Sequence, residues 1–258
     1  ERVIFVPPLV ASRNALCTVS TNSASTKPLN DAQMRGGLFL SSTGRIVTKK
    51  NWLSLEEQQH LLAQRGLQIT SHADCTQALQ TIGYYHLSGY ARFFQMDPKN
   101  GDNNFRAGTR LSDILELVRR DALLRSLCIA HLARIELALR TGFAHRFGEL
   151  VGPYTELLEP TNYSTTGSSR PLHELIKEGL DQSKQPFIVR HRKGDGTYPT
   201  LPVWIAVEAL AFGTLSRAIE HCANKEVVTG LADDLGLARS GFSSQVHSFV
   251  ALRNACAH

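Results

Sequence analysis

An arginine, an asparagine and a histidine close the chain, as Arg253, Asn254 and His258, and their types suit phosphodiester chemistry. Metal-free cleavage of RNA needs a group that takes the proton from a 2′-hydroxyl and a positive charge beside the phosphate. Histidine titrates near neutrality, and arginine keeps its charge and binds phosphate oxygens. These types suggest His258 as general base or acid, Arg253 as phosphate ligand and Asn254 as an orienting group.

The five-residue spacing between Arg253 and His258 limits this interpretation. On an ideal helix five residues turn by about 140° and rise by about 7.5 Å, so the two side chains do not share one face. They can still meet in a common groove, above all one completed by a second copy of the helix. We therefore expect a homodimer with a composite site. As a bare pattern, the spacing is also common by chance.

The same spacing recurs in Arg140-Thr-Gly-Phe-Ala-His145. Gly142 weakens the helix there, and a threonine takes the place of the asparagine. Two interpretations stay open for this second copy. It is either a charged, solvated helix end, or it lines the same cleft as the C-terminal motif.

Helices must position these side chains, and the hydrophobic pattern predicts helices almost throughout. The strongest signal is the proline-free stretch 111–146, where apolar residues recur every three or four positions. That stretch forms one long helix or two in succession. Shorter helices are predicted at 54–65, 73–82, 171–183, 202–223 and 240–258. Strand-like alternation is scarce, so the predicted fold class is all-α.

Local signals mark where several of these elements begin and end. Ser54-Leu-Glu-Glu57 has the form of a capping box, and Gly66 is well placed to end the helix that follows. Residues 97–108 and the basic segment 190–199 are predicted loops. Residues 1–48 lack sustained periodicity and are rich in small polar residues, so we expect a disordered or non-native leader.

Composition narrows the class of protein. The chain has 258 residues and a formal charge of +5, a basic excess that suits an RNA partner without requiring one. Its five cysteines are odd in number and none are at metal-ligand spacing, which argues against a disulfide framework and a zinc site and fits a cytoplasmic location. We expect no metal, no cofactor and no membrane span, because the sequence has neither a glycine-rich phosphate loop nor a long apolar run.

Several short segments follow one another in a distinctive order from about residue 49 onward. They are Glu56-Glu57-Gln58, Arg65-Gly66-Leu67, Ile82-Gly-Tyr-Tyr-His-Leu-Ser-Gly-Tyr90, Phe105-Arg-Ala-Gly-Thr109, Arg134-Ile-Glu136-Leu-Ala-Leu-Arg140-Thr141, Leu201-Pro-Val-Trp204 with Glu208, Phe212-Gly-Thr-Leu-Ser216 and Leu252-Arg253-Asn254-x-Cys256-Ala257-His258. Together they resemble the bacterial abortive-infection Abi family, the AbiD/AbiF-like phage-resistance proteins.

That family is similar to the HEPN superfamily of helical bundles, many of which are metal-independent RNases with an arginine-polar-x-x-x-histidine motif. The resemblance implies an Abi-family domain at 49–258 with a HEPN-like core at about 110–258 and additional N-terminal helices. It places the motif on Arg253, Asn254 and His258. It also implies that Glu136 and Arg140 lie on an earlier helix facing the motif. The family usually continues beyond this histidine, so we expect a C-terminal truncation.

Other side chains have two open interpretations. Tyr84, Tyr85 and Tyr90 either stack unpaired bases or pack in a turn against the core. The basic run of Arg190, Arg192 and Lys193 is either a solvated charge run or a contact to the RNA backbone.

A single helix over 202–223 has structural consequences of its own. Trp204 and Phe212 are predicted core residues on its apolar face. Glu208 is predicted to form a buried ion pair with an arginine of the long helix, because a buried charge without a partner is costly. Cys256 is predicted to be a small packing residue.

The resulting hypothesis is a cytoplasmic, metal-independent endonuclease that cuts single-stranded RNA in phage defence. Such an enzyme is toxic to its host, so some control is expected, and a phage-derived trigger is one form of it. The rival hypothesis is a binding module that grips RNA or a protein and blocks it without cutting. The rival needs Arg253 for contact but has no use for His258.

Overall fold

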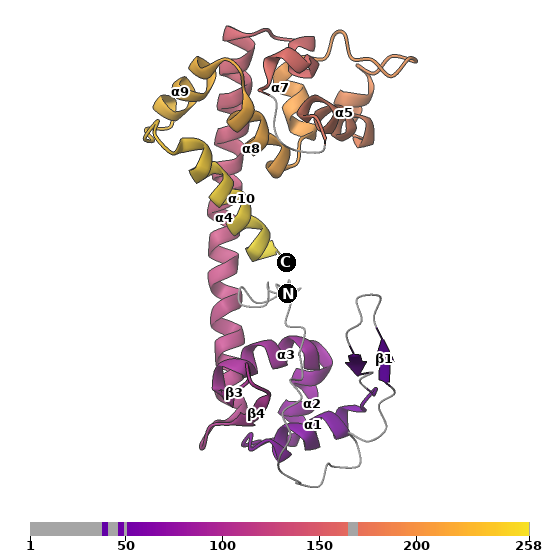
Figure 1. Cartoon of the computed structure of the whole chain (residues 1–258), viewed down its shortest axis with the longest axis vertical. Helices are drawn as coiled ribbons and strands as arrows, with labels where there is room; N and C mark the ends of the chain where they lie inside the picture. Colours follow the sequence, from indigo (N-terminus) through magenta and orange to yellow (C-terminus); the bar gives the residue numbers. More distant parts are fainter. Residues whose placement is uncertain (1–37, 41–45, 49–50, 165–169, 258) are drawn as a thin grey trace. The chain divides into compact units, whose positions relative to one another are not determined.

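A computed structural model describes residues 38–40, 46–48, 51–164 and 170–257 (Figure 1). Helices make up most of these residues, which confirms the predicted all-α class. The chain divides into two compact units, 1–123 and 124–258, and the boundary falls within helix α4 (Leu111–Leu150). Most of the expected leader lies outside the described residues. Within it, β1 (Leu38–Leu40) pairs antiparallel with β2 (Ile46–Thr48).

Among the described residues of the first unit, three α-helices precede α4, namely α1 (Leu55–Gln64), α2 (His72–Thr81) and α3 (Tyr84–Ala91). The predicted capping box is confirmed, because Ser54 Oγ accepts from the Glu57 N–H and the Glu57 carboxylate accepts from the Ser54 N–H at 2.7 Å. Gly66 has φ +91°, a conformation that glycine adopts without strain just after a helix end. Both local predictions for this region therefore hold.

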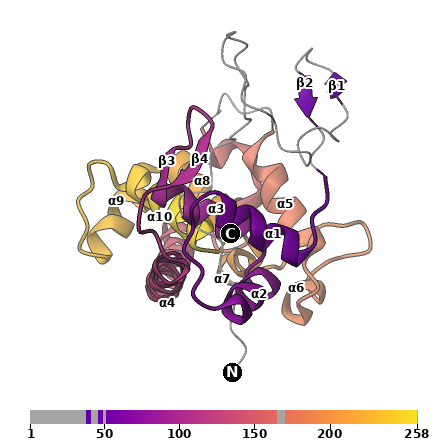
Figure 2. The same cartoon turned by 90° about the horizontal axis from the view of Figure 1, so that it is seen from below.

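The segment after α2 differs from the prediction. The aromatic run at 83–90 forms helix α3, which leads into the 3-10 helix η1 (Arg92–Phe94). Residues 97–108 do not form a loop throughout. Instead β3 (Gln95–Asp97) pairs antiparallel with β4 (Asp102–Phe105) around a turn in which Gly101 has φ +93° (Figure 2). Phe105, at the end of β4, is buried in the core of this unit and so anchors the hairpin to it.

One continuous helix, α4, accounts for the whole predicted stretch 111–146 and continues to Leu150. The prediction of a helix is confirmed, and of its two forms the single helix is the one observed. In the second unit, its apolar face packs into the main core through Leu139, Phe143 and Phe147. This face carries the i, i+4 spacing that buries one side of a helix.

The remaining elements of the second unit pack around this part of α4. Two 3-10 helices come first, followed by a series of α-helices and one further 3-10 helix. They are η2 (Thr155–Leu158), η3 (Pro160–Asn162), α5 (Leu172–Gln182), α6 (Pro186–Val189), α7 (Val203–Ala206), η4 (Val207–Ala209), α8 (Phe212–His221), α9 (Lys225–Asp234) and α10 (Phe242–Ala257). Helices α8 and α10 share the main core with α4 (Figure 1).

The predicted single helix over 202–223 is wrong. The chain forms α7 and η4, then runs extended at Leu210 and Ala211 before α8 begins. The carbonyls of Val207 and Leu210 accept hydrogen bonds from the Arg140 guanidinium of α4. These bonds replace helical ones, so a side chain from a distant part of the sequence stabilises the break.

Helix α9 was not predicted. It begins at a recognisable cap, because the Asn224 side chain accepts from the Glu226 N–H at 3.0 Å. Val227 and Leu231, four residues apart, are fully buried. The sequence signal for this helix is therefore present but short.

Candidate functional site

The C-terminal helix α10 presents the motif arginine beside α4. It packs through Phe242, Val246 and Val250, and Cys256 in its last turn is fully buried, as predicted for a packing residue. Arg253 then falls on a half-buried flank of the helix, and Asn254 is exposed. His258, the residue after the helix, lies outside the described residues.

Arg253 lies against two groups from other elements. Its Nε is 3.8 Å from Glu136 Oε2 of α4, and its guanidinium carbon is 5.8 Å from the centre of the Phe212 ring. The Arg253 side chain keeps 31% of its surface exposed. The arginine is thus oriented by an ion pair and an aromatic face while part of it remains open to a ligand.

Glu136 joins Arg253 to a second, buried arginine. Arg140, one turn further along α4, is only 8% exposed, and its Nη2 donates to Glu136 Oε1 at 2.7 Å. Its Nη1 donates to the carbonyl oxygen of Val207 and to that of Leu210, the latter at 3.0 Å. A buried guanidinium is tolerated only with such partners. Two arginines and one carboxylate leave this cluster with a net positive charge.

A further buried arginine holds the end of α10. Arg125 of α4 is fully buried, and its Nη1 donates to the carbonyl oxygen of Ala255. The last carbonyls of a helix have no partner within the helix, and a cation there also complements the helix dipole. Arg125 thus positions the turn that carries Arg253. Arg125 was not predicted as a site residue, although its place seven residues before Leu132, on the buried face of the helix, was a usable signal.

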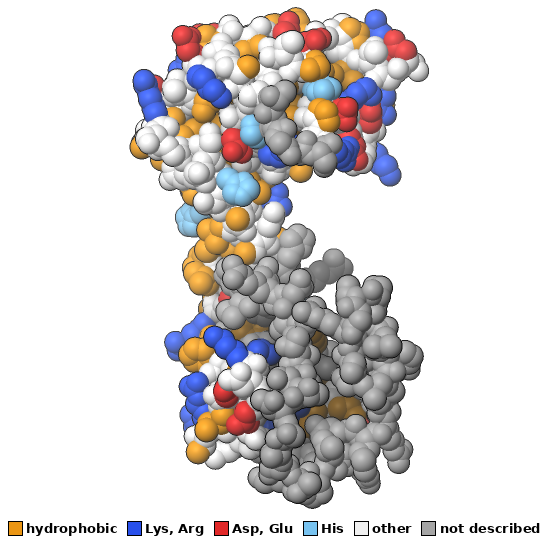
Figure 3. All heavy atoms as spheres, in the orientation of Figure 1, with side chains coloured by type: hydrophobic (Ala, Val, Ile, Leu, Met, Phe, Trp, Pro, Cys, Tyr) orange, Lys and Arg blue, Asp and Glu red, His pale blue; other side chains and the backbone are white. Residues whose placement is uncertain are grey.

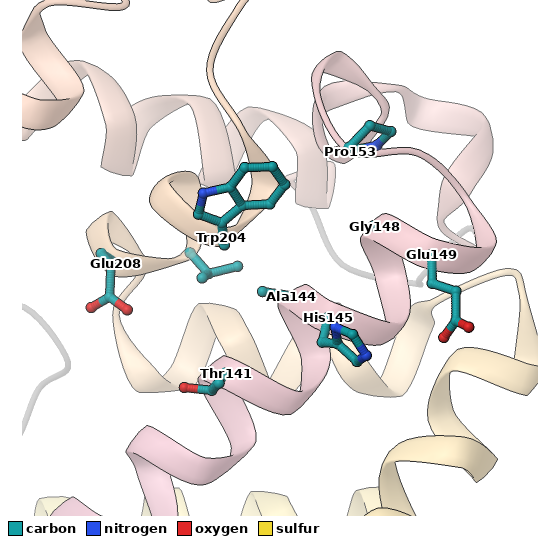
Figure 4. Close-up of a pocket in the computed structure, with 9 residues that line it drawn as sticks. Thr141, Ala144, His145, Gly148, Glu149, Pro153, Trp204 and Glu208 are labelled. Atoms are coloured by element: carbon teal, nitrogen blue, oxygen red, sulfur yellow. The ribbon is translucent and has the colours of Figure 1, made fainter.

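His145, the histidine of the second motif copy, lies elsewhere on α4. It is exposed and lines a cavity of about 430 Å³ together with Thr141, Trp204 and Glu208 (Figure 4). Val207, whose carbonyl accepts from Arg140, also lines this cavity. The structure therefore brings Arg140 to the cluster with Glu136 and Arg253 and places His145 in the neighbouring cavity.

Two predictions about this region are wrong. Trp204 is 55% exposed and is not a core residue, whereas Phe212 is fully buried as predicted. Glu208 is exposed and forms no ion pair with α4, because Glu136 takes the arginine that Glu208 was expected to bind. Both errors follow from the break after η4, which changes the direction of the residues before it.

In the basic segment after α6, one arginine forms hydrogen bonds within the protein, and the other arginine and the lysine are exposed. Arg192 donates from Nε to the Tyr198 hydroxyl at 2.6 Å and from Nη2 to the Leu180 carbonyl at 2.6 Å. Arg190 and Lys193 are exposed. Of the three basic residues predicted to contact RNA, Arg190 and Lys193 therefore keep their charged groups exposed, and that contact stays a prediction.

The tyrosines of α3 differ in their surroundings. The Tyr84 hydroxyl accepts from Arg65 Nη1 at 3.0 Å, and the buried Tyr90 donates to Asp121 Oδ2 at 2.8 Å. Tyr85 is 81% exposed. Packing thus accounts for Tyr84 and Tyr90, and Tyr85 remains available for stacking.

Neither a metal site nor a membrane span is found where the chain is described. No group of three or more His, Cys, Asp or Glu side chains in that part could hold a metal ion. Among the same residues, none of the helices combines the length and apolar character needed to cross a bilayer.

Comparison with known proteins gives one family. The family model described as Abi-like protein matches residues 77–258, more than half of the chain and all of the second unit. No curated protein and no solved structure matches the chain.

Proposed function

Because the chain belongs to the Abi-like protein family, which indicates abortive-infection phage defence, we propose that it acts there as a metal-independent RNA endonuclease. In this proposal the activity resides in a HEPN-like core at about 110–258, and the chain is of the AbiD/AbiF-like kind. The substrate is single-stranded RNA. The enzyme damages its own host when active, so it is held in check until infection, for which a phage-derived trigger is the simplest signal.

The observation that carries the proposal is the cluster of Arg253, Glu136 and Arg140. A positive charge that is oriented but still open is what a phosphate in the transition state requires. The ion pair with Glu136 and the Phe212 ring orient Arg253, and its exposed third leaves room for phosphate oxygens. Arg140 adds a second positive charge to the cluster, and its hydrogen bond to the Leu210 carbonyl holds its side chain in place.

The proposed chemistry uses these groups in order. His258 takes the proton from the 2′-hydroxyl, whose oxygen attacks the adjacent phosphorus. The bond from phosphorus to the 5′-oxygen breaks, that oxygen takes a proton from water to become a 5′-hydroxyl, and His258 returns its proton to the solvent. Arg253 stabilises the charge on the phosphate, and Asn254 orients one of the two groups. The products are a 2′,3′-cyclic phosphate and a 5′-hydroxyl.

A homodimer is part of this proposal. Leu127 and Leu137 of α4 and Leu252 of α10 are exposed leucines close in sequence to the cluster. Figure 3 shows hydrophobic side chains on the surface of α4. A second copy covering them would bring a second motif to the site, which would overcome the angular separation of Arg253 and His258.

The test is cleavage of labelled single-stranded RNA in EDTA. His258→Ala and Arg253→Ala should each lower the rate by about 100-fold or more. His247→Ala is the matched control, because His247 is an exposed histidine on the same helix. Equal cleavage by all variants would refute the proposed site. If the parent protein binds the RNA but does not cleave it, the result would favour the binding module instead.

A further inference from the structure

Trp204 is an unusual surface residue. Its neighbours Val203 and Ala206 are buried, yet its own side chain is 55% exposed. The backbone beneath it is fixed, because the Val203 N–H donates to the Pro153 carbonyl at 2.8 Å. A rigid, exposed indole that the core does not use is a ready surface for a flat ligand.

The cavity beside Trp204 has an apolar floor and a polar rim. Ala144 and Val207, both buried, form the floor, and Figure 4 shows Trp204 and Glu208 on one segment and Thr141 and His145 on the neighbouring helix α4. Its volume of about 430 Å³ lies within the range of small-ligand sites. The shape therefore accepts a planar ring with polar atoms along one edge.

The charged groups at the rim of the cavity determine which kind of polar edge a bound ring must have. Glu149, at the other side, is already paired with Arg146 at 3.4 Å. Glu208 has no ion-pair partner among the residues described. A carboxylate accepts hydrogen bonds and repels phosphate, so it selects N–H donors and keeps the nucleic-acid backbone outside.

We propose that this cavity binds one unstacked nucleobase of the RNA, with guanine preferred. The ring stacks on Trp204, and the Glu208 carboxylate accepts from the two neighbouring N–H groups of the guanine Watson–Crick edge. The proposal deepens the proposed function and rests on it, since it names the part of the substrate that this neighbouring cavity recognises.

The cavity is linked by direct contacts to the arginine cluster. Thr141 follows Arg140 on α4, and Val207 both lines the cavity and accepts from Arg140. Arg140 in turn shares Glu136 with Arg253. A base in the cavity and a phosphate at Arg253 would thus be connected through the side chains of Arg140 and Glu136.

A basic partner protein would be the other ligand with matching chemistry, since arginine also stacks on tryptophan and pairs with carboxylates. The surroundings disfavour it. The chain carries a formal charge of +5, and the arginine cluster beyond the cavity is positive, which favours an anionic polymer over a cationic partner on this part of the protein. An anionic polymer that presents a neutral base to Glu208 and its phosphates to the arginines matches both charges.

Fluorescence can test the site without any cleavage. The chain has two tryptophans, so a Trp52→Phe background leaves Trp204 as the reporter. The probes are 2′-O-methyl trinucleotides ApGpA, ApIpA and ApUpA, which a nuclease that needs a 2′-hydroxyl leaves intact. ApGpA should quench the fluorescence with a Kd at least about fivefold lower than those of ApIpA and ApUpA.

Substitutions can test whether the preference for guanine depends on the Glu208 carboxylate. Glu208→Gln should bring the three Kd values together, whereas Glu174→Gln, an exposed glutamate of α5 away from the cavity, should leave the order unchanged. Equal quenching by all three probes, or none, would overturn the proposal. So would quenching by an arginine-rich peptide alone, which would assign the cavity to a basic protein.

These measurements test the base-binding cavity and the nuclease activity independently of each other. His258→Ala should abolish cleavage and leave the quenching of Trp204 by ApGpA unchanged. A parent that is quenched selectively but cuts no RNA would keep the base site and remove the nuclease.

Discussion

Glu136 Oε2 lies 3.8 Å from Arg253 Nε, and through its other oxygen the same carboxylate accepts from Arg140 at 2.7 Å. One acidic side chain therefore fixes two arginines of different helices. Its loss should affect both the stability of the unit and the position of the motif arginine.

Glu136→Gln removes the charge while keeping the side-chain shape. We expect the free energy of unfolding to fall by roughly 1–3 kcal/mol, because buried Arg140 loses its charged partner. Urea unfolding followed by circular dichroism measures the change. Glu149→Gln is the matched control, since its ion pair is more exposed. An unchanged midpoint would mean that the carbonyls alone hold Arg140.

Arg125→Met removes the hydrogen bond to the Ala255 carbonyl and keeps most of the side-chain volume. The last turn of α10 should then open more readily, and amide hydrogen exchange at 251–257 should speed up by about fivefold or more. Arg134→Met, at an exposed position of the same helix, should leave that exchange unchanged. Equal exchange in both variants would contradict the role given to Arg125.

Gly142 sits where α4 meets α9. A Cβ added there would lie 2.5 Å from Leu231 Cδ1, and the Leu231 side chain is fully buried. Gly142→Ala should therefore destabilise the protein by about 1 kcal/mol, because overpacking outweighs the gain in helix propensity. Thermal unfolding tests this. Adding Leu231→Val should recover part of the loss, and a Gly142→Ala variant more stable than the parent would refute the close-packing argument.

The pair of Arg146 and Asp234 predicts a dependence on pH. Arg146 donates to Asp234 at 2.7 and 2.6 Å, and these hydrogen bonds lower the pKa of Asp234 below its ordinary value of 3.8. A lowered folded-state pKa gives stability that is present above the unfolded value and lost as the pH falls through the folded one. Urea midpoints should thus fall less steeply in Asp234→Asn than in the parent between about pH 4 and pH 2. Parallel curves would contradict this.

Much of the helical framework follows from local signals. The capping box at Ser54, the periodic stretch that became α4 and the final helix were all predictable, because the residues that determine them are neighbours in sequence. The meeting of Glu136 with Arg253 was expected from a family resemblance alone. No spacing rule relates two helices so far apart along the chain.

The remaining features depend on contacts between distant residues. Trp204 has the pattern of a core residue, yet the break after η4 turns it outward. The hairpin of β3 and β4 has few strand-forming residues and is stabilised by the burial of Phe105. Tertiary contacts outweigh local preference in both places.

The break between η4 and α8 has a consequence for the order of folding. Residues 202–223 carry a helical pattern, and at the break the Arg140 guanidinium donates to the carbonyls of Val207 and Leu210, while the Leu210 N–H also donates to the Val207 carbonyl at 3.2 Å. Before α4 is in place, this segment should follow its own preference and wind into a longer helix. The native break would then form by unwinding, and we expect assembly of this unit to include a step in which helix is lost.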